Sequence, residues 1–226
     1  MLSEAIVPLL LTLKVATLAT VFASIVGIAV AKFLGRRRTF ARDVVESLLT
    51  LPLVLPPTVL GYYLLVVLGH NGFFGAWLMR DFGISLIFTW QGAVIAAAVA
   101  AFPLTLRAAR AAFSDVDAQL ENAARTLGAS ESEVFFRVTF PLAWRGVLAG
   151  ALLAFARAMG EFGATLMVAG SLPGRTQTLS LAIYDAVMAG DDARANALVI
   201  VSLVTAVVVL LIAARLLQRT QRMTLT

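Results

Sequence analysis

Five long apolar segments, separated by polar and basic residues, constrain this chain more than any other feature. They cover residues 6–34, 44–68, 84–112, 144–169 and 195–217. A helix needs about 20 apolar residues to cross the hydrocarbon core of a bilayer. Hydrophobic residues make up 60% of the chain, against about 45–50% in soluble domains. The sequence therefore predicts an all-α integral membrane protein, a polytopic helical bundle of about five transmembrane helices in a single domain over residues 1–226.

The positions of Lys and Arg predict the orientation of these helices, because cytoplasmic loops carry the positive excess. With the N-terminus outside, thirteen of the eighteen basic residues fall on the cytoplasmic side and four on the outer side. The thirteen are Lys32, Arg36, Arg37, Arg38, Arg42, Arg107, Arg110, Arg125, Arg137, Arg145, Arg215, Arg219 and Arg222. The outer four are Lys14, Arg80, Arg175 and Arg194, and Arg157 lies within a span. We therefore expect an outer N-terminus and a cytoplasmic C-terminus.

A further apolar segment, residues 176–189, is too short to fit this series. Its helix would rise about 21 Å, against a hydrocarbon core of about 30 Å. It is either re-entrant or a short sixth span. A sixth span would move Arg215, Arg219 and Arg222 outside, against the charge rule, so we expect it not to cross.

The segment LPLVLPPTVLG, residues 51–61, carries three prolines within a membrane segment. Pro52, Pro56 and Pro57 each lack a backbone donor, so the helix is expected to kink or unwind there. One interpretation is a kink that serves packing alone. The other is a bend that lines a translocation pathway, with Pro56, Pro57 and Thr58 facing water.

Several kinds of chemistry find no support in the sequence. The chain has no cysteine and one histidine, so it offers no thiolate or histidine-rich metal site and no plausible nucleophile and base pair. The phosphate-binding pattern GxxxxGK[ST] does not occur. The net charge of +5 is gathered at the ends of apolar runs, which indicates membrane lipid and not nucleic acid as the contact. We therefore expect no metal, no bound cofactor and no enzymatic activity in this chain.

The longest polar region covers residues 114–141. Glu121 to Leu127 has helical composition, Gly128 is a natural stop, and Glu131 to Val138 can form a second short helix. The neighbours Ala123 and Ala124 would form a narrow ridge able to enter a groove on a partner protein. An amphipathic helix lying on lipid headgroups is the alternative.

The spacing in this region resembles the cytoplasmic EAA loop of ATP-binding cassette (ABC) importer permeases. Asn122, Ala123 and Ala124 are followed by Gly128 at the family's distance, and Val138, Phe140 and Pro141 complete the pattern. Asn122 replaces the usual Glu, and Phe140 the usual Leu. The resemblance implies that residues 114–141 form a coupling loop to a separate ATPase subunit. The implied contact residues are Glu121, Asn122, Ala123, Ala124, Arg125, Gly128, Val138 and Pro141.

Residues 51–69, the loop, and residues 155–184 together resemble the molybdate importer permeases, with sulfate and thiosulfate permeases as near relatives. The resemblance implies a type I importer fold, a homodimer, two ATPase subunits that bind ATP and Mg, and a periplasmic oxyanion-binding protein. It also implies the bacterial cytoplasmic (inner) membrane and alternating access. Tungstate, sulfate or thiosulfate remain alternative substrates, and a secondary anion carrier is the alternative from another class. Such a carrier would not need the loop.

Arg157 and Glu161 are charges inside an apolar segment, where a charge costs about 2.5–3.5 kcal/mol on insertion scales. Their four-residue spacing allows an ion pair, which we interpret as structural or gating; direct anion contact by Arg157 is the alternative. Gly163 favours close helix packing over ligand contact, and Thr165 offers a hydroxyl. The candidate pathway or gate residues are Pro56, Pro57, Thr58, Arg157, Glu161, Gly163 and Thr165.

Overall fold

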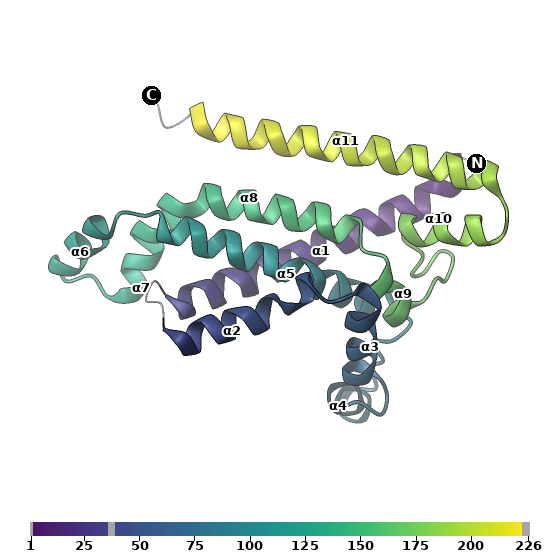
Figure 1. Ribbon diagram of the computed structural model, residues 1–226, viewed down its shortest axis with the longest axis horizontal. Helices are drawn as coiled ribbons and strands as arrows, with labels where there is room; N and C mark the ends of the chain where they lie inside the picture. Colours follow the sequence, from purple (N-terminus) through teal and green to yellow (C-terminus); the bar gives the residue numbers. More distant parts are fainter. Residues whose placement is uncertain (1, 36–38, 223–226) are drawn as a thin grey trace.

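A computed structural model describes residues 2–35 and 39–222, in which every regular element is helical (Figure 1). The long helices are α1 (Leu2–Leu34), α5 (Trp90–Ser114), α8 (Phe140–Met159) and α11 (Asp192–Arg222). The shorter helices are α2 (Phe40–Thr50), α3 (Pro57–Leu68), α4 (Phe73–Phe82), α6 (Ala118–Thr126), α7 (Glu131–Val134), α9 (Gly163–Ala169) and α10 (Leu179–Met188). The predicted basic residues Arg36, Arg37 and Arg38, and the side chains of Arg219 and Arg222, lie outside the described part.

Four helices of the described chain are long and apolar enough to cross a membrane: α1, α5, α11, and α8 together with the turns before it. A fifth span is possible if α2 and α3, which meet at an angle of 106°, are counted as one. The prediction of about five spans is therefore confirmed. Helix α10 has ten residues, which rise only about 15 Å, so this segment is too short to cross, as expected.

Helix α5 forms the centre of the bundle. In its most apolar window 61% of residues are buried inside the chain, against 6% for α11. The core around it is built from small side chains: Ala16, Ala19, Ala93, Ala97, Ala98, Ala101, Ala154 and Ala158. A Cβ added at Gly150 of α8 would lie 2.2 Å from the Cβ of Ala108 on α5. Close backbone approach between small residues is how membrane helices pack, since burying apolar surface gains little in lipid.

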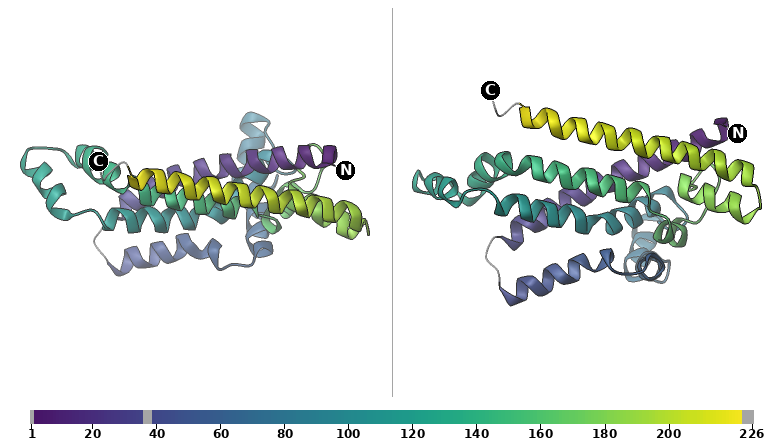
Figure 2. Two further views of the ribbon diagram at one scale, coloured as in Figure 1. Left: turned by 90° about the horizontal axis from the view of Figure 1, so that it is seen from above. Right: turned by 45° about the horizontal axis from the view of Figure 1, so that its top comes forward.

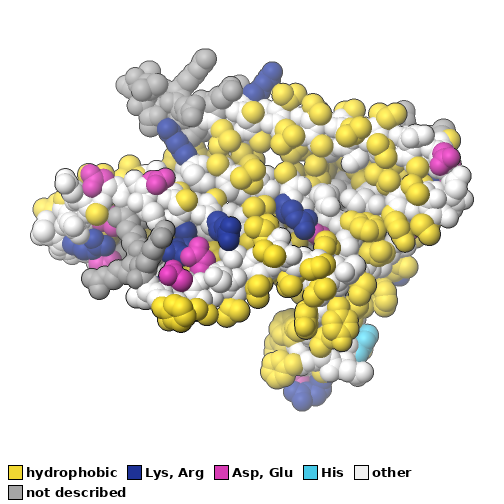
Figure 3. Space-filling model, viewed as in Figure 1, with side chains coloured by type: hydrophobic (Ala, Val, Ile, Leu, Met, Phe, Trp, Pro, Cys, Tyr) yellow, Lys and Arg dark blue, Asp and Glu magenta, His cyan; other side chains and the backbone are white. Residues whose placement is uncertain are grey.

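The two ends of the bundle differ. Helices α6 and α7 lie at the end where α1, α5 and α11 finish, whereas the N-terminus and α10 lie at the opposite end (Figures 1 and 2). The described chain thus begins and finishes at opposite ends, as an odd number of crossings requires. Hydrophobic side chains cover most of the long helices on the face in Figure 3, and acidic side chains gather mainly toward the α6 end.

The proline segment bends as predicted. After α2 a short 3₁₀ turn, Leu51–Leu53, is followed by Pro56 at the N-cap of α3 and Pro57 as its first residue. Both positions suit proline, which needs no donor at a helix start and has φ preset for it. The carbonyl of Pro56 accepts hydrogen bonds from Val59 and Leu60, so the new helix starts there.

Two predicted segments are helical over only part of their length. Residues 144–169 were expected as one helix, but α8 ends at Met159 and α9 starts at Gly163. The break is stabilised by Glu161, whose carboxylate accepts a hydrogen bond from the Ala164 amide at 2.9 Å. In the segment 84–112 the helix begins only at Trp90, because Thr89 caps it through the Gly92 amide at 3.2 Å.

Candidate functional site

The polar loop folds as two capped helices. Asp117 caps α6 by accepting from the Gln119 amide at 2.8 Å, and Gly128, at φ +86°, ends it. This left-handed conformation favours glycine. Ser130 and Glu133 form a reciprocal capping box at the start of α7. The predicted helix near Glu121 to Leu127 and its glycine stop are therefore confirmed.

The second loop helix is continuous with the membrane helix. A π-helical turn, Phe135–Thr139, joins α7 to α8. Pro141 explains the wide turn, because its nitrogen cannot donate to the preceding turn and its ring would clash there. Val138 is half-buried in this turn and Pro141 is exposed in the first turn of α8. Both predicted loop residues thus belong to the helix that leads into the membrane.

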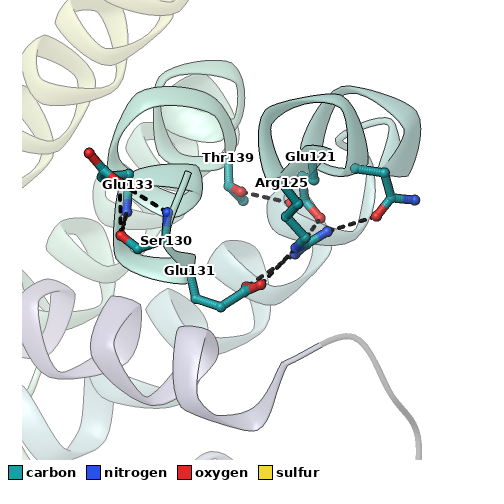
Figure 4. A network of polar contacts seen from close by, with 7 residues as sticks. Glu121, Arg125, Ser130, Glu131, Glu133 and Thr139 are labelled. Atoms are coloured by element: carbon teal, nitrogen blue, oxygen red, sulfur yellow. Dashed lines mark hydrogen bonds and ion pairs between the residues drawn. The ribbon is translucent and has the colours of Figure 1, made fainter. Parts of the chain in front are cut away.

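Arg125 ties the two loop helices together (Figure 4). Its Nε and Nη2 donate to the two carboxylate oxygens of Glu131 at 2.7 and 3.2 Å, and its Nη1 donates to Asn122 Oδ1 at 2.9 Å. Glu121 Oε2 lies 3.8 Å from Nη2. A two-point guanidinium–carboxylate contact fixes orientation as well as distance. The hydrogen bond from Arg125 lowers the pKa of the Glu131 carboxyl, which lies in the polar loop outside the membrane.

Glu121 stabilises the loop from inside. It is buried, and its Oε1 accepts a hydrogen bond from Thr139 Oγ1 at 2.7 Å. Glu121 and Arg125 were expected to fix the position of a partner protein, but the structure directs both side chains into contacts within the chain. Both set the shape of the loop; Glu121 is buried, whereas Arg125 is also part of the exposed surface.

The outer surface of the loop includes an apolar residue that sequence reasoning missed. Leu127 is 88% exposed at the end of α6, next to Gly128, and Ala123 is exposed beside it while Ala124 is half-buried. The alanines do not form one ridge, because adjacent helix residues point about 100° apart. A single exposed leucine is common on protein surfaces, so by itself Leu127 shows only that an apolar side chain is available for contact at this point of the loop. The sequence feature that could have revealed it is an apolar residue directly before the glycine that ends the helix.

The second group of predicted residues lies where α3 meets α9. A Cβ added at Gly163 would lie 2.6 Å from the Cβ of Pro57. Likewise, a Cβ at Gly61 would lie 2.7 Å from the Cβ of Met167. The structure thus brings the proline bend and the Gly163 segment into direct contact, although about a hundred residues of chain separate them.

Arg157 and Glu161 form the predicted ion pair, with Arg157 Nη1 at 2.7 Å from Glu161 Oε2. Glu161 was expected inside a continuous helix, but it lies in the break after α8. Its side chain is 2% exposed and that of Arg157 is 32% exposed. The carboxylate therefore has two partners, the guanidinium and the Ala164 amide that begins α9. The pair joins the end of α8 to the start of α9.

The remaining pathway candidates do not share one surface. Pro56 and Thr58 are exposed at the bend, whereas Thr165 on α9 is 1% exposed. In this conformation Thr165 therefore lies away from any surface that an anion could contact. Within residues 2–35 and 39–222, no three His, Asp or Glu side chains lie close enough together to hold a metal ion.

Comparison with known proteins relates this geometry to a family. A family described as "Binding-protein-dependent transport system inner membrane component" matches residues 23–222. The "Molybdenum transport system permease protein ModB" of Escherichia coli strain K12 is 48% identical over 204 residues, which are 90% of this chain and 89% of that protein. The ModB protein of Haemophilus influenzae is 42% identical, covering 94% and 93%. The "Sulfate transport system permease protein CysT" of E. coli is 33% identical, covering 88% and 72%.

Solved structures show the same fold at low sequence identity. A chain of the MetNI methionine ABC transporter, in inward-facing conformations, superposes with a TM-score of 0.71 at 17% identity, covering 92% of both chains. A chain of a bacterial ABC transporter involved in the import of the polysaccharide alginate gives 0.75 at 16% identity, covering 96% of this chain and 79% of that one. The family match spans most of the sequence and the fold agrees with it. The chain is therefore a multi-pass membrane protein that belongs to the family of binding-protein-dependent transport system inner membrane components.

Proposed function

We propose that this chain is the membrane-spanning subunit of an ABC importer that translocates molybdate across the bacterial inner membrane. The observation that carries the proposal is the 48% identity to a molybdenum transport permease over 90% of the chain. The identity to the sulfate permease is lower, at 33%. Molybdate is therefore favoured over sulfate or thiosulfate, and tungstate shares its charge and shape.

The chain is proposed to depend on other subunits for energy and for substrate capture. Since the sequence has no phosphate-binding pattern, ATP and Mg would be bound by two ATPase subunits, and this chain would not itself be catalytic. Each ATPase would contact one coupling loop of a homodimer, through the exposed surface around Ala123, Leu127 and Gly128. A periplasmic binding protein would deliver the oxyanion at the opposite end.

The geometry suggests how movement of the loop would be transmitted. From Glu131 to Met159 the chain is helical over 29 residues, about 44 Å at 1.5 Å per residue. Arg125 joins α6 to Glu131 at the start of this helix. A displacement of the loop would therefore move α8 as a rod. The far end of that rod carries Arg157, whose partner Glu161 begins the contact with α9.

The Arg157–Glu161 pair is proposed as a gate element and not as a strong anion site. A carboxylate beside the guanidinium repels a dianion, and it already has two partners. Opening the joint between α8 and α9 would separate the pair and expose the guanidinium. Weak binding suits a transporter, since a tightly bound ion would not be released.

Reconstitution tests this function. The purified chain would be placed in proteoliposomes with its ATPase subunit and the binding protein, and ATP hydrolysis and oxyanion uptake would be measured with molybdate, tungstate, sulfate and thiosulfate. We expect molybdate to stimulate both activities, and no uptake without the ATPase. Stimulation by sulfate alone would refute the substrate assignment. Anion uptake without the ATPase would refute the whole proposal in favour of a secondary carrier.

A further inference from the structure

A basic cavity of about 400 Å³ lies at the α6 end of the bundle. Its walls come from the end of α1, from α2, from the end of α5, and from the coupling loop. The basic residues in its lining are Lys32, Arg42, Arg110 and Arg125. The carboxylates in the lining are Glu121 and Glu131. None of this space is used by the transport mechanism proposed above.

The ion pairs around this cavity leave a positive excess. Arg110 pairs with Glu46, which lies outside the lining, and Arg125 pairs with Glu131. The Lys32 ammonium lies 4.4 Å from the ring centre of Phe135 and 5.0 Å from that of Phe136. The lining itself holds four cations against two carboxylates, Glu121 and Glu131, and so carries a formal excess of two positive charges. The cavity therefore has both the space and the charge for an anionic group.

An apolar groove adjoins the basic cavity and shares Arg42 with it. The groove lies between the end of α1 and the start of α2. Its other lining residues are Ala29, Val30, Phe33, Leu34, Ala41 and Val45. A charged cavity joined to an apolar groove through one arginine has the amphipathic character of a phospholipid.

We propose that an anionic phospholipid binds here, with its phosphate headgroup in the basic cavity beside Lys32 and Arg42 and an acyl chain in the groove. The coupling-loop end is predicted to be cytoplasmic, and basic pockets between membrane helices on that side bind anionic headgroups. A free oxyanion such as phosphate or molybdate would share the headgroup's chemistry but would make no use of the groove. The cavity is lined by α1, α2, α5 and the loop, so a bound headgroup would connect these elements and lipid charge would stabilise the position of the loop.

Lipid retention by the purified chain tests this proposal without any measurement of transport. Native mass spectrometry in detergent would compare phosphatidylglycerol with phosphatidylcholine of the same acyl chains. We expect phosphatidylglycerol to be preferred. The double variant Lys32→Gln, Arg42→Gln should weaken its binding about 25-fold, since each basic residue near an anionic lipid contributes about fivefold. Equal binding of the two lipids, or an unaltered double variant, would overturn the proposal.

Arg107→Gln is the matched control. Arg107 lies on α5 one turn before Arg110 and lines a neighbouring cavity, which shares Arg110 and Ser114 with the basic cavity but includes neither Lys32 nor Arg42. Its replacement removes one positive charge from the same end of the bundle and should leave lipid binding unchanged. If the double variant does not elute with the wild-type profile in gel filtration, Lys32→Gln alone replaces it, with a loss of about fivefold expected.

Two further variants distinguish the sources of the anion. Ala41→Trp would fill the groove; loss of phosphatidylglycerol with unaltered binding of inorganic phosphate supports a lipid. If Ala41→Trp still binds phosphatidylglycerol, and millimolar phosphate or molybdate displaces this lipid, the groove takes no part in binding. That result would overturn the lipid proposal in favour of a free oxyanion. Because the chain has no cysteine, Ala41→Cys tests whether a second copy of the chain covers the groove. Disulfide-linked dimers through this position would show that the groove is a protein interface and would overturn the lipid proposal.

Discussion

The coupling loop and the α3–α9 junction hold their shapes by different means. In the loop, side chains pair across a turn, as Arg125 does with Glu131. At the junction, Gly163 lies against Pro57 so closely that one added carbon has no space. Electrostatic pairs can be removed singly with moderate effect, whereas the packing of Gly163 against the proline ring leaves no space for even one added methyl group. The loop should therefore tolerate changes that the junction does not.

The largest effect is expected at the junction. Gly163→Val would place side-chain carbons against Pro57, and overpacking of this kind costs about 1–3 kcal/mol or more. Thermal unfolding should shift to lower temperature and molybdate uptake should be lost. Gly160→Ala is the control, since its Cβ would meet its nearest neighbours only at 3.8 Å and beyond. Equal effects of the two substitutions would contradict the steric account.

Glu161→Gln should have the next largest effect. It removes the charge that Arg157 faces and weakens the bond to the Ala164 amide. A weakened hydrogen bond to a charged group costs about 1.5–3 kcal/mol, less here because Arg157 is a third exposed. ATP hydrolysis should continue while uptake falls.

The double variant Arg157→Gln, Glu161→Gln provides the control for this pair. It should regain thermal stability relative to Glu161→Gln, because no charge is left without its partner. If Glu161→Gln left folding, assembly and transport all unchanged, the pair would have no gating role.

A smaller effect is expected inside the loop. Thr139→Val removes the hydrogen bond that the Thr139 hydroxyl donates to the buried Glu121. Glu121 keeps its contact with Arg125, so we expect a cost of about 0.5–1 kcal/mol, within the range for one hydrogen bond. The expected result is weaker stimulation of the ATPase in the assembled complex, with little change in the unfolding temperature of the bundle. The control is Thr126→Val, whose hydroxyl bonds to the Ala123 carbonyl at the exposed surface. A larger effect of the control would show that Glu121 does not organise the loop.

The smallest expected effect is that of low pH on the ion pair between Arg125 and Glu131. Arg125 lowers the pKa of Glu131, so the pair contributes fully above the ordinary glutamate pKa of about 4.3 and is lost as the pH falls through the lowered value. Spin labels at Leu120→Cys and Ser132→Cys would report the distance between α6 and α7. The distance distribution should broaden only as the pH falls below the ordinary glutamate pKa in the wild type, and at every pH with Glu131→Gln. An unchanged distance in that variant would remove Arg125 from its proposed role.

Hydropathy and charge were sufficient to predict the spans and the short α10, and the prolines were sufficient to predict the bend at Pro56 and Pro57. These features depend on segment length and on backbone donors, which are local properties of the sequence. The break after Met159 was missed because an apolar segment with glycines fits either one helix or two. The outcome depends on Glu161 finding the Ala164 amide.

In the loop, too, features that depend on neighbouring residues could be predicted, whereas contacts between residues distant in the sequence could not. Residue composition predicted its two helices, and the glycine predicted the stop at Gly128. The internal partners of Glu121 and Arg125 could not be predicted, because Thr139 and Glu131 approach them only after the turn has formed. Contact between Pro57 and Gly163 likewise depends on how α3 and α9 pack, which no local pattern in the sequence specifies.

The most direct test of the central claim is the reactivity of a single cysteine at Leu127, in a chain that has no other. A membrane-impermeant maleimide should not label Leu127→Cys in intact cells. In inside-out vesicles it should label the cysteine rapidly, and addition of the ATPase subunit should protect it. Labelling from the outside of intact cells, or no protection by the ATPase, would contradict the assignment of this loop as the site where an ATPase drives the transporter.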